Sequence, residues 1–484
     1  MASLAGTIAA HRGMGYVVAP AGYGKTHLIA EALQYTPSRD LILTHTYAGV
    51  NALRHKLRTL GVPSTSYRLD TIASWALRVC LSYPQSAEWT IKEPQGQEWR
   101  DLYVRCASLL DRAFVKRVVR ASYNAVYVDE YQDCAASQHD LVLKLAATLP
   151  VRLLGDPLQG LFDFAGEAAV DWDTQIAPHF QQLGELDTPW RWKKVGAIAL
   201  GAWLDTARKQ LEAKAVIDLN DLPAGVADVY ICPSDDELRN KQITICKYLD
   251  RPNGENAVAI HKGDSQHKAR CQTLARNTGG RFSSIEEIEG KRMFAFIKEY
   301  DGKTSAQERL LCAIEFAKTK CMSAVDSALC AGTKRGERVT IKQSTKNPGV
   351  AVSANEFLEN PAPARLARFL RSLLDAPETR VYARDLFNRV MRVLANCEPQ
   401  SDVSLATRAQ AFQGEFRHSG RLLRHPNLVG TTLLLKGLEF DHAIVLDAGS
   451  LSTRDLYVAL TRGSRSLTII SRTNLLNVVA GAAK

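Results

Sequence analysis

One stretch near the N-terminus constrains the fold more than any other part of the sequence. The apolar run Tyr16-Val17-Val18 is followed by a loop of small residues and then by Gly24-Lys25-Thr26. Small residues allow successive backbone N–H groups to face one anion, and a helix that starts there adds its dipole. Lys25 can then reach the outer phosphates of a nucleotide, and the Thr26 hydroxyl can ligate Mg²⁺. The stretch predicts a strand, a phosphate-binding loop and a helix over Thr26–Leu33.

The same tripeptide occurs twice, and the two copies differ in context. The strict Walker pattern has glycine at its first position, where this chain has Ala19. The second copy, Gly302-Lys303-Thr304, has no small-residue loop before it. We therefore expect phosphate binding at the first copy and a surface turn at the second.

The composition favours a multidomain globular protein with a polyanionic partner. A chain of 484 residues exceeds what one hydrophobic core usually covers. Its 46% hydrophobic and 23% charged residues exclude a disordered chain. Lysine and arginine number 61 against 51 acidic residues, a net charge of +10, which leans toward nucleic acid.

The cysteines and the hydropathy pattern bear on the compartment. None of the ten cysteines forms a Cys-x-x-Cys pair, so neither a zinc ribbon nor a disulfide framework is indicated. The first residues lack a basic region before their apolar residues, and no apolar run reaches the roughly 18 residues of a membrane helix. We expect a cytoplasmic protein with reduced thiols.

The next segments repeat the order of strand, loop and helix. Asp40–Thr46 has the pattern of a buried strand running into a turn, and Val50–Leu60 that of a helix. Such repetition is typical of a parallel sheet. Trp75 either packs in the core or offers its ring to a nucleobase, and residues 76–120 are largely helical.

Two adjacent carboxylates follow a third strand pattern. Ala125–Val128 is apolar and leads into Asp129 and Glu130. Ligands bind at the carboxyl ends of strands in open parallel sheets. Beside a phosphate-binding loop, Asp129 would hold Mg²⁺ and Glu130 would polarise the water that attacks the γ-phosphate.

A further strand pattern, Pro150–Asp156, precedes more polar and aromatic residues. Gln159 can sense a γ-phosphate or its attacking water, and Phe162 and Phe164 follow closely. Trp190-Arg191-Trp192 places a guanidinium between two rings, which suits the phosphates and base of a nucleotide.

Taken in order, these segments resemble the motif series of superfamily 1 DNA helicases of the UvrD/Rep type. The phosphate loop resembles motif I, Leu43–Thr46 motif Ia, Asp129–Asp133 motif II, Gly155–Gln159 motif III and Trp190-Arg191 motif IV. Near the C-terminus, Thr431–Asp441 resembles motif V and 455–463 motif VI, and a strand is expected over His442–Leu446. The seven motifs span almost the whole chain.

The resemblance implies an α/β fold with two RecA-like P-loop domains, each with a parallel sheet and a mainly helical insertion. The first domain would cover residues 1–192 with its insertion near 76–118. The second would take 193–300 and 425–484, and its insertion 301–424. Within that insertion, Leu366, Phe369 and Leu370 share an apolar face, which predicts a helix over Ala364–Leu374.

The resemblance also implies roles for individual residues, with ATP and Mg²⁺ held between the two domains. Catalysis would fall to Lys25, Asp129, Glu130, Gln159, Arg191 and Arg462, and Mg²⁺ to Thr26 and Asp129. ATP would contact Ala19, Pro20, Ala21, Gly22, Tyr23, Gly24, Lys25, Thr26, His27, Trp190, Arg191, Gly437, Glu439 and Arg462. DNA would contact His45, Thr46, Trp75, Phe162, Phe164 and Thr431.

The departures from the family fall mainly on the DNA side. Motif Ia has His45 for the usual Phe, motif V has Leu433 where a His is common, and Ala165 follows the motif III aromatics where an Arg is usual. The glutamine that reads adenine upstream of the phosphate loop is also missing, with Leu4 at the equivalent position.

These observations lead to two hypotheses. The first is an ATP-dependent 3′–5′ translocase or helicase acting on single-stranded or tailed duplex DNA. The second is a nucleotide-sensing regulatory ATPase subunit that controls a partner effector without unwinding DNA. The short first insertion resembles compact relatives such as the helicase-like subunit of Gabija-type antiphage systems, which implies a nuclease or other protein partner in DNA repair or phage defence.

Overall fold

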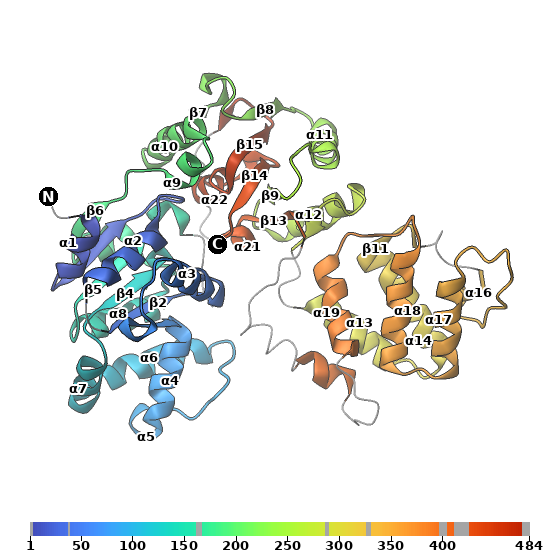
Figure 1. Ribbon diagram of the computed structural model, residues 1–484, viewed down its shortest axis with the longest axis horizontal. Helices are drawn as coiled ribbons and strands as arrows, with labels where there is room; N and C mark the ends of the chain where they lie inside the picture. The colour runs from blue at the N-terminus through green and yellow to red at the C-terminus, as the bar shows by residue number, and fades with distance from the viewer. Residues whose placement is uncertain are drawn as a thin grey trace. The chain divides into compact units, whose positions relative to one another are not determined.

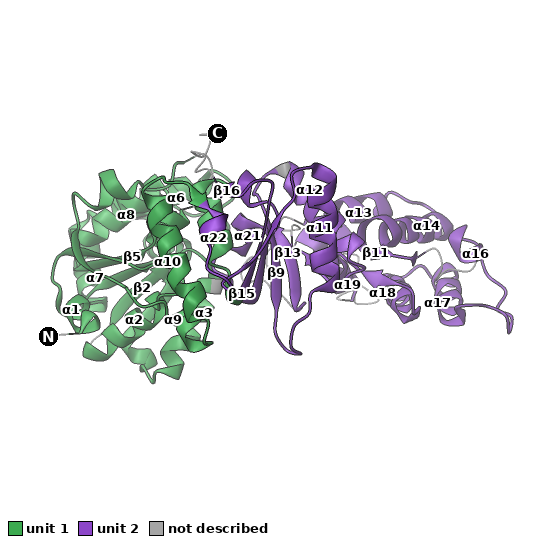
Figure 2. Cartoon of the chain, turned by 90° about the horizontal axis from the view of Figure 1, so that it is seen from above, with its two compact units in different colours: residues 1–217, 451–465, 477–484 green, residues 218–450, 466–476 purple. Residues whose placement is uncertain are grey.

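The computed structural model describes residues 3–36, 39–160, 167–285, 290–325, 331–395, 404–410 and 425–476. By its internal contacts the chain divides into two compact units (Figure 2). Unit 1 contains residues up to 217 together with 451–465, and unit 2 contains 218–450 and 466–476. This division into two units does not test the predicted boundaries of the domains and insertions, which remain predictions.

Unit 1 is built on a six-stranded sheet in the order β3-β2-β4-β5-β1-β6, with parallel pairing throughout. This order brings the ends of β1, β4 and β5 together although they are far apart in sequence. The strands are β1 (Met14–Val18), β2 (Asp40–Thr44), β3 (Tyr67–Thr71), β4 (Val126–Asp129), β5 (Val151–Gly155) and β6 (Gln181–Glu185).

The inner strands β2 and β4 are buried along their whole length because helices cover both faces of the sheet. Along β2, Leu41 and Leu43 pack on one face and Ile42 on the other. Along β4, Val126 and Val128 share the first face, and Tyr127 the second. Alternate side chains of a strand point to opposite faces, so each face has its own apolar cluster.

The helices of unit 1 lie on both sides of this sheet. Figure 2 shows α6 and α8 on one side and α1, α2 and α3 on the other. Four helices, α4 to α7, form the segment between β3 and β4. The bounds are α1 (Leu4–Ala10), α2 (Lys25–Ala32), α3 (Tyr47–Thr59), α4 (Ile72–Ser82), α5 (Pro84–Ala87), α6 (Glu98–Leu110), α7 (Ala113–Ser122), α8 (Ala136–Ala146), α9 (Trp190–Lys194), α10 (Ile198–Glu212) and α22 (Thr453–Leu460).

Unit 2 contains a second six-stranded sheet, in the order β10-β13-β9-β14-β15-β8. The pairs β10–β13, β13–β9, β9–β14 and β15–β8 are parallel. The strands are β8 (Asp228–Ile231), β9 (Ala257–His261), β10 (Ser283–Ser284), β13 (Asn427–Thr431), β14 (Phe440–Val445) and β15 (Gly463–Ser471); β7 (Ile217–Asp218) and β16 (Leu475–Leu476) are short strands outside it.

A largely helical segment joins β10 to β13 in unit 2, and its helices form a group of their own (Figure 1). In α18 (Pro363–Ser372), Leu366, Phe369 and Leu370 are buried, while Arg368 pairs with Glu356 at the surface. The other elements are α11 (Asp235–Tyr248), α12 (Ser265–Asn277), α13 (Lys291–Asp301), α14 (Ala306–Phe316), β11 (Met322–Ser323), α16 (Ala331–Lys334), α17 (Pro348–Glu359), β12 (Arg380–Val381), α19 (Arg384–Ala395) and α21 (Thr432–Leu435).

Two parallel sheets, each interrupted by a mainly helical segment, confirm the predicted α/β fold class with two RecA-like domains. The second Gly-Lys-Thr lies in the turn between α13 and α14, as expected. Among the described residues, no helix combines the length and apolar character that crossing a membrane requires.

Candidate nucleotide-binding site

The loop between β1 and α2 has the shape that phosphate binding requires. Gly22 and Gly24 have φ values of 80° and 94°, in the left-handed region that favours glycine. A Cβ on Gly22 would lie 2.9 Å from the Cβ of Arg191. The Gly22 carbonyl also accepts a hydrogen bond from the Arg191 amide at 2.9 Å. The loop is therefore held closely against the start of α9.

Lys25, the first residue of α2, forms ion pairs with both predicted catalytic carboxylates. Its Nζ lies 3.2 Å from Asp129 Oδ1 and 2.6 Å from Glu130 Oε1. Lys25 and Asp129 are both buried. Burial raises the pKa of Asp129 against the opposing attraction of Lys25. Burial alone would lower the pKa of Lys25, but the two carboxylates outweigh it and raise that pKa.

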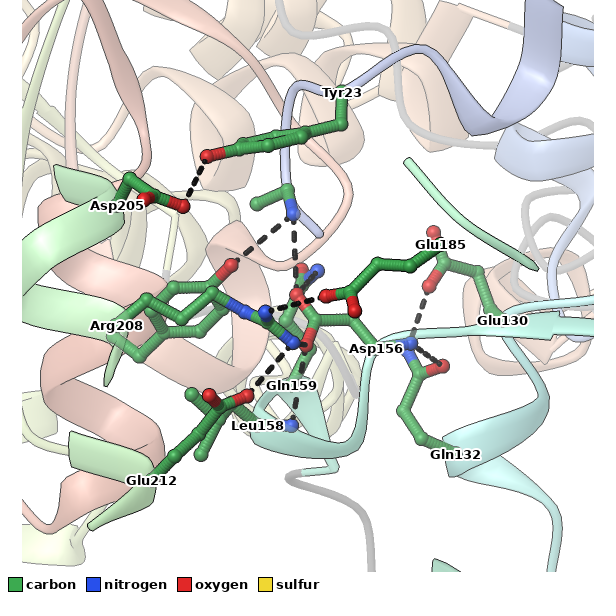
Figure 3. Close-up of polar contacts among 12 residues, drawn as sticks. Tyr23, Glu130, Gln132, Asp156, Leu158, Gln159, Glu185, Asp205, Arg208 and Glu212 are labelled. Carbon is green, nitrogen blue, oxygen red and sulfur yellow. Dashed lines mark hydrogen bonds and ion pairs between the residues drawn. The ribbon is translucent and has the colours of Figure 1, made fainter. Parts of the chain in front are cut away.

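Asp156, directly after β5, connects the phosphate loop with Gln159. Its Oδ2 accepts hydrogen bonds from the Ala21 amide at 3.1 Å and from Gln159 Nε2 at 2.8 Å. The Ala21 amide also lies 3.2 Å from the Tyr457 hydroxyl of α22. Asp156 is fully buried, and Figure 3 shows Gln159 and Arg208 beside it. A buried carboxylate with several donors is a rigid anchor for the groups bonded to it.

A second charged residue, Arg208 of α10, balances Asp156. Arg208 is 5% exposed and contacts Asp156 at 3.5 Å, Glu185 at 3.3 Å and Glu212 at 2.9 Å. On the same helix, Asp205 accepts a hydrogen bond from the Tyr23 hydroxyl at 3.0 Å. Helix α10 therefore contacts the phosphate loop directly through Asp205 and Tyr23, and indirectly through Arg208 and Asp156 (Figure 3). The sequence-based reasoning missed this role of α10.

Arg462, predicted to reach the γ-phosphate, belongs to the same network. It is 2% exposed, and its Nη2 lies 3.3 Å from Gln159 Oε1. Its Nε donates to the Val458 carbonyl at 2.9 Å, which fixes the guanidinium against α22. Gln159 is thus bonded to both Asp156 and Arg462, so unit 1 brings motifs I, III and VI into one cluster.

Arg191 and its neighbour join this cluster through backbone carbonyls. Arg191 Nη1 donates to the Thr461 carbonyl at 2.5 Å, and Trp192 Nε1 donates to the Gly463 carbonyl at 2.9 Å. Helix α9 is therefore held next to the chain on both sides of Arg462.

The residues predicted to flank the base are accessible. Trp190 is 44% exposed, and a Cβ on Gly24 would lie 3.3 Å from its Cδ1 atom. His27 of α2 has an exposed side chain. Partial desolvation of the ring is the largest cause that lowers its pKa, and the positive charge of Lys56 is the next. An exposed indole beside the phosphate loop is suitable for stacking on a base.

The described residues offer few ligands for Mg²⁺, as expected for a metal ion that binds together with a nucleotide. Asp129 lies beside Lys25, and Thr26 follows Lys25 in α2 with a partly exposed side chain. No group of three or more His, Cys, Asp or Glu side chains able to hold a metal occurs in the described part of the chain. Magnesium in nucleotide sites takes only one or two protein ligands, with phosphate and water supplying the rest.

Several predicted residues lie outside this cluster. Gly437, with a φ of 77°, and the exposed Glu439 belong to unit 2, in the turn after α21. His45 and Thr46 follow β2, where Thr46 caps α3 by accepting from the Gly49 amide at 3.0 Å. Their predicted roles in ATP and DNA binding remain predictions.

The predicted aromatic and hydroxyl contacts to DNA have different outcomes. Trp75 is 1% exposed inside an apolar cluster of unit 1, so its ring has no free face for a base in this structure. The packing alternative that the sequence left open is the one observed. Thr431, at the end of β13, is also fully buried. Phe162 and Phe164 lie outside the described residues.

Together the sheet, the glycine-shaped loop and the acid pair define the class of a P-loop nucleotide-binding α/β protein. A narrower assignment comes from residues 85–171, which match the family model described as UvrD/REP helicase N-terminal domain. This match confirms the resemblance to UvrD-like superfamily 1 helicases over that segment. No curated protein matches the chain.

Solved structures with weak similarity include two Pif1 helicases and a viral helicase. The Bacteroides Pif1 helicase in complex with ADP-AlF3 and ssDNA is 10% identical, with 97% of this chain and 91% of that chain covered and a TM-score of 0.38. The Candida albicans Pif1 helicase is 11% identical, with 97% of this chain and 94% of that chain covered and a TM-score of 0.37. Arterivirus nonstructural protein 10 (helicase) with DNA is 15% identical, with 54% and 50% covered and a TM-score of 0.28. The chain spans about half the length of the arterivirus structures that it matches.

Proposed function

We propose that this chain is an ATP-dependent translocase or helicase that moves 3′–5′ on single-stranded DNA. The observation that carries the proposal is one network of polar contacts that joins Lys25 to Arg462. Glu130, the ion-pair partner of Lys25, accepts a hydrogen bond from Gln132 Nε2 at 2.6 Å, and Gln132 Oε1 accepts one from the Asp156 amide at 3.0 Å. The Asp156 carboxylate in turn contacts Gln159, which contacts Arg462. ATP hydrolysis requires a phosphate cradle, an acid pair for metal and water, and a cation at the γ-phosphate. The direction of movement and the choice of DNA come from the resemblance to UvrD/Rep-type helicases.

The ion pairs of Lys25 suggest how ATP binding changes the site. Lys25 neutralises Asp129 and Glu130 through these two ion pairs. With the phosphates of ATP as partners of Lys25, Asp129 and Thr26 would hold Mg²⁺, and Glu130 would orient water. Bound Mg²⁺ would neutralise charge on the phosphate oxygens. Arg462 and Gln159 would stabilise the charge that develops on the γ-phosphate.

The second hypothesis, a nucleotide-sensing regulatory subunit, is favoured by a specific observation. Trp75 and Thr431, two of the predicted DNA contacts, are buried. A regulator needs the nucleotide network but not a surface that grips DNA. A nuclease partner is part of this hypothesis and of the motor hypothesis alike, and it rests on the family resemblance.

ATPase activity with and without single-stranded DNA distinguishes the two hypotheses. The assay is run beside strand displacement on duplexes with a 3′ or a 5′ tail. For a motor we expect DNA to stimulate turnover and displacement to occur from the 3′ tail only. DNA-independent turnover without displacement would contradict the motor and support the regulator. Glu130→Gln is the hydrolysis control, because it keeps Lys25 and Asp129 but removes the carboxylate that polarises water.

A further inference from the structure

Unit 2 contains a cavity of about 290 Å³ that has no part in the nucleotide site. Helices α11 and α12 form its sides, with Leu238, Ile243 and Leu274 as its apolar residues. His261, the last residue of β9, and Arg472, the first residue after β15, also line it. The cavity therefore lies at the carboxyl ends of parallel strands, the edge where open α/β sheets bind ligands.

The charges around the cavity favour an anion. Arg239, Arg270 and Arg472 line it together with a single acid, Asp235. Arg472 is neutralised, because it pairs with Asp235 and with Asp447 at 3.5 Å. Neither Arg239 nor Arg270 forms an ion pair among the described residues; Arg270 Nη1 lies 3.4 Å from His267 Nε2, and its charge also acts on Asp447. Two guanidinium groups at one cavity are the donors that best match the oxygens of a phosphate.

His261 is a second, independent feature of the cavity lining. It is 2% exposed, and its Nδ1 has no hydrogen-bond partner among the described residues. Burial is the main cause that lowers the pKa of His261 to about 3, and the positive charges of His267 and Arg270 lower it further. The imidazole is therefore neutral and can place its proton on Nδ1. A buried polar atom without a partner is costly, so a ligand oxygen at this position would remove a penalty.

We propose that this cavity binds the phosphate group of a small molecule, held by Arg239 and Arg270, with His261 as a further lining residue. Its volume of about 290 Å³ lies just below the roughly 300–1,000 Å³ typical of small-molecule sites, which suits a compact ligand better than a polymer strand. The neutral polar side chains of Thr273 and Asn277, with the apolar residues beside them, can accept an organic group attached to the phosphate.

Calorimetric titration of the full chain with inorganic phosphate and with ribose 5-phosphate tests this proposal. We expect Arg239→Gln and Arg270→Gln each to weaken binding by about tenfold, the usual loss for one charge-assisted hydrogen bond. Both arginines are exposed, so neither substitution leaves a buried cavity. Lys268→Gln is the matched control, because Lys268 is an exposed cation of the same helix that does not line the cavity.

The comparison of the two probes identifies the source of the phosphate. Tighter binding of ribose 5-phosphate indicates a phosphate monoester, and equal affinities indicate free phosphate. Lys25→Ala should leave the affinity unchanged, which separates this site from the nucleotide site. Unchanged binding in both arginine variants, or an equal loss in Lys268→Gln, would overturn the proposal. So would displacement of the probes by single-stranded DNA, because the cavity would then belong to a nucleic-acid surface.

Discussion

At the scale of single residues, Gly22 shows how tightly the phosphate loop is packed. Its φ of 80° is unfavourable for other residues, and a Cβ there would also meet Arg191 and Trp192 within 3.0 Å. A glycine in a phosphate loop is expected from the sequence. The second constraint could not be predicted, because it depends on α9, which follows about 170 residues later.

Gly22→Ala should lower both stability and ATP affinity. The left-handed backbone alone costs a side chain about 1–2 kcal/mol, and the contact with α9 adds to it. Gly61→Ala is the matched control, because Gly61 has a φ of 70° and open space around it. Urea unfolding of the two variants measures the difference. Equal losses of stability in Gly22→Ala and Gly61→Ala would show that the close contact with α9 does not contribute to the cost of the substitution.

Asp40, at the start of β2, should make stability depend on pH. It is fully buried with Oδ1 unpartnered among the described residues, and burial raises its pKa to about 6 from 3.8. The folded state therefore binds this proton more tightly than the unfolded chain does. The stabilisation is complete below the unfolded pKa and is lost as the pH rises through 6, at most about 3 kcal/mol.

Asp40→Asn removes this dependence. We expect the variant to gain unfolding free energy relative to the original chain at pH 7.5 and to gain only about half as much at pH 5, which lies midway between the unfolded and folded pKa values. Thermal unfolding at both values measures this, with the exposed Asp173→Asn as a control for loss of a charge. A gain at pH 5 as large as that at pH 7.5 would show that Asp40 is not held in its neutral form.

At the scale of elements, local patterns predicted most of what lies around the site. The strands expected near residues 16, 40, 125 and 150 are β1, β2, β4 and β5, and the helix expected over 364–374 is α18. Continuous apolar runs and a clear helical period carry this information in the sequence. Helix α10 was missed as a part of the site, because Arg208 meets partners 52 and 23 residues earlier, which no local pattern reveals.

Arg208→Gln tests whether α10 positions the phosphate loop. It leaves the buried Asp156 without its counter-charge, so we expect a loss of stability of about 3–5 kcal/mol, the usual cost of an unpaired buried charge. Turnover should fall more than the affinity for ATP, because Gln159 and Arg462 are placed through Asp156. Steady-state kinetics separate kcat from KM.

Two variants make this test specific. Arg208→Lys keeps the charge and should restore most of the turnover. Lys209→Gln removes a neighbouring exposed cation that pairs with Asp205, and it should change little. If Arg208→Gln behaved like Lys209→Gln, α10 would have no part in holding the site.

At the scale of the whole molecule, the motif order predicted two sheets of RecA type, and both are present. The sequence was less informative about which of the two units contains the segment around Arg462. Residues 451–465 group with unit 1, while the strand that follows continues into the sheet of unit 2. This grouping depends on contacts of α22 with the phosphate loop, and of Thr461 and Arg462 just after it with Arg191 and Gln159, which join residues some 270 to 440 positions apart.

The central claim is that one buried network joins the phosphate loop to Arg462 for ATP hydrolysis. Its most direct test is the single-turnover hydrolysis rate of Arg462→Lys, measured beside the binding of a fluorescent ATP analogue. Lysine keeps the charge but cannot bond to both Gln159 and the Val458 carbonyl as arginine does. The account predicts a loss of hydrolysis of about a thousandfold or more with binding largely retained. Hydrolysis at the original rate, in a variant that still binds the analogue, would contradict it.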